Sequence, residues 1–184
     1  MNIKTRPILS ALFYGYALLC CAPEVYAASI VTNVAIDVLS PISITQTTAM
    51  NLGRVMRPTG GTPSAVTLST AGVRSISGGN GALVSGGTIN AASYKIFGSS
   101  TYLVNLSVTS ITNPGTGLTL SNFFGKFNAG SDTNIDSGAG GQATLTTLAE
   151  STGDVLSVGA KLTLTSSSIA GSYTGNYTLN VDYP

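Results

Sequence analysis

The sequence has 184 residues, with 8 Lys and Arg against 7 Asp and Glu, no histidine and 2 cysteines. A net charge of +1 with only 8% charged residues excludes the basic surface that binds nucleic acid. Because the sequence has no histidine, it lacks the most common catalytic base. Both cysteines, Cys20 and Cys21, lie near the start, so the rest of the chain has no thiol nucleophile and no thiolate metal ligand.

The first 27 residues have the pattern of a secretory signal peptide. Two cations precede an apolar run at 8–21, and the segment ends on Ala27 at the position that signal peptidase reads. The run is shorter than the ~20 residues of a membrane-spanning helix, and Pro23 and Glu24 interrupt it. We therefore expect export through the Sec pathway to the periplasm, cell surface, a fimbrium or the medium, with no membrane insertion after cleavage.

From residue 28 on, short segments alternate apolar and polar residues, and clusters of Gly, Pro, Asn and Ser separate them. This pattern predicts a single all-β domain, an antiparallel β-sandwich of immunoglobulin-like or pilin-like type, although a barrel would show the same alternation. The predicted strands are 30–39, a segment resuming at 42–44 after Pro41, 50–55, 65–70, 73–77, 93–97, 102–108, a segment from 118 into the phenylalanines, 143–148, 156–164 and 172–183.

Two of these segments, 93–97 and 102–108, are predicted to form a hairpin around Gly98-Ser99-Ser100. The three phenylalanines that follow are interpreted as core rather than as a ligand platform, because aromatic side chains are buried more often than not. They are Phe123, Phe124 and Phe127.

The final segment alternates up to the last residue but one. One face carries the apolar side chains of Tyr177, Leu179, Val181 and Tyr183. Burial of such side chains stabilises by about 1.5–3 kcal/mol each, comparable together with the net stability of a domain. We expect this strand to be essential for folding.

Candidate chemistry is sparse. Residues 132–138 begin with the oxygen spacing of a calcium loop, but Ser137 replaces its glycine and Ala143 its glutamate, so an Asx-type turn is the preferred interpretation. The glycine clusters 78–81 and 138–141 lack the Lys-Ser/Thr of a phosphate loop. We predict no enzyme activity, cofactor or metal site; a hydrolase would need two loop carboxylates to converge, from Asp132, Asp136, Glu150 and Asp154.

Several stretches resemble the bacterial secreted family DUF4402. They are 40–55, 66–74, 91–96, 158–164 and 170–177, so the resemblance covers nearly all of the chain after the signal peptide. It implies a β-domain from residue 40 to 184 but no activity, because that family is defined only as a domain of unknown function.

The ending is also similar to subunits of chaperone-usher fimbriae, including their spore-coat-U-like domains. This looser resemblance implies an incomplete sandwich whose groove is filled by an arm from the next subunit. Residues 28–39 would be that arm, with Thr32 interrupting its apolar series Ile30, Val34, Ile36 and Val38. The partners would be further copies or other fimbrial subunits, and a periplasmic chaperone that recognises the strand Tyr177, Leu179, Val181 and Tyr183.

Alternation alone leaves two alternatives open. Residues 28–39 pair either with a neighbour or within their own chain as the first strand of a complete sandwich, because the side-chain geometry is the same. The protein is accordingly either a structural subunit of a fimbria or cell surface, or a monomeric surface or secreted domain that binds a glycan or host protein. The second alternative needs an exposed aromatic platform, from Tyr94, Tyr102 and the phenylalanines.

Overall fold

The computed structural model describes residues 28–136 and 140–184, so the predicted signal peptide lies outside the described residues. The chain divides into two compact units, Met1–Ile36 and Asp37–Pro184, which are described separately. In the first unit, residues 28–36 belong to no strand and their side chains are exposed.

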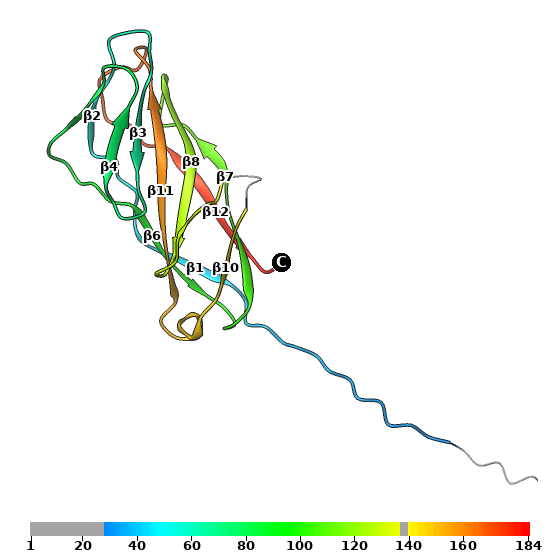
Figure 1. The fold of residues 1–184 in the computed structure, drawn as a ribbon. Helices are drawn as coiled ribbons and strands as arrows, with labels where there is room; N and C mark the ends of the chain where they lie inside the picture. The colour runs from blue at the N-terminus through cyan, green and yellow to red at the C-terminus, as the bar shows by residue number, and fades with distance from the viewer. Residues whose placement is uncertain (1–27, 137–139) are drawn as a thin grey trace, which may run out of the picture. The chain divides into compact units, whose positions relative to one another are not determined.

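Apart from one short 3₁₀ helix, the regular secondary structure described in the second unit consists of strands (Figure 1). In chain order they are β1 (Ser43–Thr48), β2 (Arg54–Met56), β3 (Ser64–Leu68), β4 (Arg74–Ser77), β5 (Ala82–Val84), β6 (Ala92–Phe97), β7 (Leu103–Thr112), β8 (Leu118–Phe127), β9 (Asp132–Asn134), β10 (Gly141–Thr144), the short 3₁₀ helix η1 (Thr147–Glu150), β11 (Asp154–Leu164) and β12 (Asn176–Asp182).

The long strand β11 is the centre of the larger sheet (Figure 1). One edge of β11 pairs with β6 along its first half and with β3 along its second half, while the other edge pairs with β8 from Leu156 to Leu164. β1 lies beyond β6, β4 beyond β3, and β9 beyond β8. A smaller sheet has the order β10-β7-β12, and β2 pairs separately with β5.

Every described strand pair is antiparallel, and a core of aliphatic and aromatic side chains fills the interior. The alternating residues of β11 that were predicted to share a face, Leu156, Val158, Ala160, Leu162 and Leu164, are all buried. The all-β antiparallel sandwich predicted from the sequence is confirmed.

The predicted hairpin between 93–97 and 102–108 is wrong. Both segments are strands, but β6 pairs with β1 and β11 in the larger sheet, whereas β7 pairs with β10 and β12 in the smaller one. The connection between them, with Thr101 at φ 68°, passes from one sheet to the other. Local alternation shows which face of a strand is apolar, but not which strand lies beside it.

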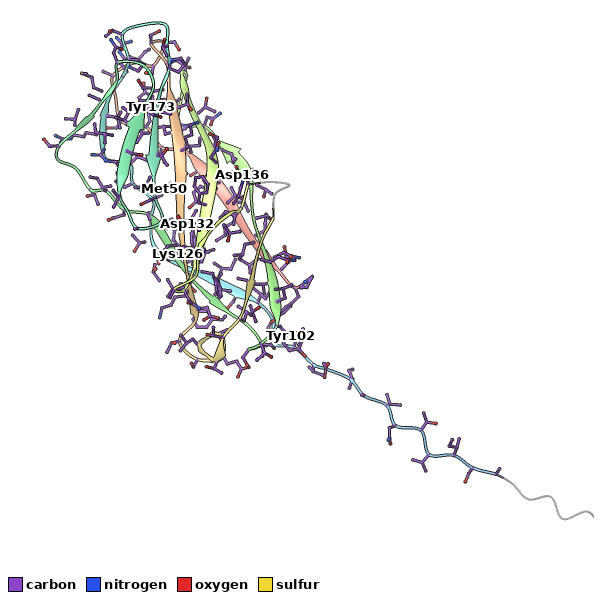
Figure 2. All side chains as sticks on the ribbon, in the orientation of Figure 1. Met50, Tyr102, Lys126, Asp132, Asp136 and Tyr173 are labelled. Carbon is purple, nitrogen blue, oxygen red and sulfur yellow. The ribbon has the colours of Figure 1, made fainter. Side chains whose placement is uncertain are left out.

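The last strand is shorter than predicted, because β12 begins at Asn176 rather than at Ser172. Tyr173 lies in the preceding loop, where its hydroxyl donates to the carbonyl of Ile169 at 2.7 Å. A Cβ on Gly115 would lie 2.8 Å from the Tyr173 ring, so the ring packs directly on that glycine. Figure 2 shows Tyr173 at one end of the sandwich and Tyr102 toward the other.

Candidate functional site

One side of the sandwich is closed by main-chain hydrogen bonds. The Ile135 amide donates to the Phe123 carbonyl of β8 at 3.0 Å, and the Ile135 carbonyl accepts from the Val108 amide of β7 at 2.7 Å. A single residue therefore joins the backbone of the larger sheet to that of the smaller sheet. The Ile135 side chain is fully buried.

The opposite side is bounded by β1 and β12, and no such joint is present there among the described residues. Within residues 28–136 and 140–184, β1 pairs only with β6, and β12 pairs only with β7. Each strand thus has one edge whose N–H and C=O groups have no strand partner, and such edges readily pair with another strand.

The core-facing side chains at these two edges are incompletely covered. Ile44 is opposite the buried Ile96 and so faces the core, yet it is 36% exposed. Leu179 is opposite the buried Val108 and is only half-buried. Gln46 also faces the core, opposite Tyr94, but is exposed. We call this surface the open side: the unpaired edges of β1 and β12 with Ile44, Gln46, Tyr177 and Leu179.

Two tyrosine hydroxyls bridge the sheets near one end of the open side. Tyr94 of β6 and Tyr177 of β12 lie with their hydroxyl oxygens 2.8 Å apart, and the Gln46 side-chain amide reaches Tyr94 at 3.5 Å. The Tyr177 ring packs against Phe123 with 4.8 Å between the ring centroids. Burial raises the pKa of both tyrosines; the shared hydrogen bond further raises the pKa of Tyr177, whereas it partly offsets the rise for Tyr94.

These pKa shifts predict a loss of stability in alkali. A tyrosine whose pKa is higher in the folded state than its ordinary value of 10.0 stabilises the fold fully below that pH, and this stabilisation is lost as the pH rises above it. We expect the urea concentration at the midpoint of unfolding to decrease as the pH is raised above 10.0. Tyr177→Phe, which costs about 1 kcal/mol at neutral pH, should show a smaller alkaline loss, whereas equal alkaline losses would contradict the role of this pair.

A second tyrosine contact marks the other end of the open side. The Tyr183 hydroxyl donates to the Ser40 carbonyl at 2.9 Å and accepts from the Ser99 amide at 2.8 Å, while the Ser40 amide donates to the Ser99 hydroxyl. Ser40 therefore lies by the end of β12, whereas Gln46 and Tyr177 both lie by Tyr94. It follows that β1 and β12 run in opposite directions along the open side.

Four apolar residues that the sequence singled out precede this site in the chain. Ile30, Val34, Ile36 and Val38 are 82–91% exposed, and none lies in a strand. Apolar side chains this exposed gain free energy when another surface covers them.

Each of the four loop carboxylates accepts hydrogen bonds from different residues. Asp132 accepts from the Thr70 hydroxyl at 2.7 Å, and Asp136 accepts from the Phe123 amide at 2.7 Å. Each of these bonds engages one oxygen of its carboxylate. The Asp136 amide donates to the Asn134 side-chain oxygen at 2.8 Å, which is the bond of an Asx turn. The remaining part of the calcium-like stretch, 137–139, lies outside the described residues.

The other two acids stabilise the loop around η1. Asp154 is fully buried and accepts from the Asn128 side-chain amide and from both the amide and the hydroxyl of Thr146. Glu150 is exposed and accepts from the amide and the hydroxyl of Ser100, bonds that lower the pKa of its carboxyl. Within the described residues no group of three or more His, Cys, Asp or Glu side chains is placed to hold a metal ion.

The aromatic residues proposed as a binding platform lie mainly inside. Phe123 is fully buried, Tyr94 is 8% exposed, and Tyr102, Phe124 and Phe127 are half-buried. In the parts 28–136 and 140–184, no helix has the length and apolar character to cross a membrane.

A family model described as a domain of unknown function, DUF4402, matches residues 42–183. The chain belongs to the DUF4402 family. The matched region extends from just before β1 to just after β12, so the DUF4402 domain includes both edges of the open side. The comparisons found no match among curated proteins or among solved structures.

The sequence of the DUF4402 protein indicates a site at only one of the two strands that border the open side. It singled out the strand with Tyr177, Leu179, Val181 and Tyr183, and the structure places that strand at an edge. It did not single out Ile44 or Gln46. A signal was present in the polar Gln46 within an alternating segment, but only the register opposite Tyr94 shows that this residue faces the core.

Proposed function

We propose that this DUF4402 protein is a non-enzymatic structural subunit of a fimbria or other surface filament, in which residues 28–39 of one copy complete the open side of the next. The observation that carries the proposal is that one chain has both free strand edges and an apolar segment without a strand partner. The open side has two free strand edges and incompletely covered apolar side chains, and residues 28–39 have exposed apolar side chains at alternate positions and no strand partner.

If residues 28–39 of another copy formed a strand between β1 and β12, the free edges would be paired and the apolar side chains would be covered. The main chain of this strand would pair with the free edges, and its alternate side chains would cover Ile44 and Leu179. Burying Ile30, Val34, Ile36 and Val38 at about 1.5–3 kcal/mol each gives roughly 6–12 kcal/mol before the cost of association is subtracted. Before assembly the same edges could pair with other chains and cause aggregation. We propose that a periplasmic chaperone prevents this by binding to β12.

The direction of the added strand determines whether a filament results. The arm leaves its own domain at Ser40, which lies at the Tyr183 end of the open side. If it enters the next copy antiparallel to β12, it emerges at the opposite end, near Tyr177, and copies add head to tail without limit. If it enters parallel to β12, like ends meet and two copies exchange arms in a closed pair. The filament proposal therefore requires the antiparallel arrangement.

Electron microscopy of cells that express the chain with its genomic neighbours tests the proposal. We expect filaments that contain the protein, and a ladder of multimers on unheated denaturing gels that collapses on boiling. A chain lacking residues 28–39 should give neither. Closed pairs only, or a well-folded full-length monomer with the arm held on its own open side, would refute the proposal.

A further inference from the structure

The turn between β4 and β5 contains the dipeptide Asn80-Gly81, which occurs once in the sequence. Asparagine is thermolabile in proteins. When glycine follows it, the glycine nitrogen can attack the asparagine side-chain carbonyl carbon, because glycine has no Cβ to hinder the approach. A cyclic imide forms and ammonia leaves, and water then opens the imide to aspartate or isoaspartate.

The fold requires a glycine at the second position. A Cβ on Gly81 would lie 2.7 Å from the Ser64 hydroxyl oxygen and 2.9 Å from the Met56 carbonyl oxygen, and Ser64 is fully buried. No larger residue fits there without displacing the turn.

The fold also uses the asparagine. The Asn80 side-chain oxygen accepts from the Thr59 amide at 2.9 Å and from the Gly60 amide at 3.5 Å, and its side-chain nitrogen donates to the Thr59 hydroxyl at 2.7 Å. These bonds tie the turn to the loop that follows β2. The fold thus requires the glycine of this labile dipeptide and engages both polar atoms of the asparagine side chain.

Both reacting groups are engaged in the folded protein. The Gly81 nitrogen, which would be the nucleophile, donates its hydrogen to the Ser64 hydroxyl at 2.9 Å, and that hydroxyl donates in turn to the Gly78 carbonyl at 3.1 Å. The side-chain carbonyl carbon of Asn80, which would be attacked, is held in place by the hydrogen bonds of the side chain to Thr59 and Gly60. Before the imide can form, the hydrogen bond of the Gly81 nitrogen and those of the Asn80 side chain must break.

We propose that Asn80-Gly81 is a deamidation site that Ser64 and Thr59 hold in the amide form while the turn is folded. Deamidation at Asn80 then reports local opening of this turn. The inference is independent of filament formation, because it rests only on contacts within one domain.

The test is the rate of deamidation of the exported chain at mildly alkaline pH, followed by mass spectrometry of the proteolytic fragment that contains residue 80. The reference is a synthetic peptide of residues 76–85. We expect the folded protein to react slower than the peptide by about tenfold or more, since both hydrogen-bonded groups must be released. Ser64→Ala and Thr59→Val should each accelerate the reaction toward the peptide rate.

Thr59→Val keeps the inference testable if Ser64→Ala fails to fold, because Thr59 is exposed and valine preserves its shape. Asn80→Asp, the product form, should fold normally, since a carboxylate oxygen accepts the same two amide hydrogens. A wild-type rate equal to that of the peptide would overturn the proposal. So would a slow wild-type rate that a folded Thr59→Val variant leaves unchanged.

Discussion

Ile36→Asn is expected to abolish the multimers that we propose for this chain. Asparagine loses about 1.5–3 kcal/mol of apolar burial at each junction, and an amide buried without a partner costs about 1–3 kcal/mol more. Together these weaken each junction by about 60-fold or more. Unheated denaturing gels and electron microscopy should show monomers only.

Asn33→Ala is the matched control, because residue 33 lies in the same segment on the opposite face of the alternation and is also exposed. It should leave the multimer ladder unchanged. Ile36 is 82% exposed in the single chain, so urea unfolding of the Ile36→Asn monomer should match that of the chain lacking residues 28–39. Wild-type filaments from Ile36→Asn would contradict the proposed role of the arm.

Gly159→Ala is expected to destabilise the domain by about 1–3 kcal/mol or more. Gly159 lies where the partner of β11 changes from β6 to β3, and an added Cβ would lie 2.3 Å from the Leu68 carbonyl oxygen and 2.8 Å from the Ser69 carbonyl carbon. Both are backbone atoms, which cannot move aside by a change of rotamer. Urea or thermal unfolding would measure the loss.

Gly60→Ala is the control for this substitution, since no atom lies within 4 Å of the position that its Cβ would take. Its effect on unfolding should be neutral or slightly stabilising, because alanine reduces the freedom of the unfolded chain. If the two variants unfolded alike, the close approach of β11 to the end of β3 would not be a determinant of stability.

Individual strands were predictable where one face is buried. The alternation at 156–164 reappears in the structure as β11 with every predicted core residue buried, because period-two alternation is what a half-buried strand requires. Pairing was less predictable. Segments 93–97 and 102–108 were both recognised as strands, but the structure assigns them to different sheets.

The candidate site shows the same division. Tyr177 and Leu179 could be placed on a buried face from the sequence, but their partial exposure results from the absence of a neighbour, which no local pattern records. Ile44 and Gln46 became part of the site only through their register with Ile96 and Tyr94. Edges are properties of a whole sheet, so they emerge only when every pairing is known.

By itself the sequence determined an all-β chain with few charges, no histidine, and an apolar alternation at both 30–38 and 177–183. The tertiary structure decided that Ile135 closes one side of the sandwich and that β1 and β12 leave the other side open. The physical reason is that alternation is set by each side chain's preference for water or core, whereas an open edge depends on which strands the chain can bring together in space.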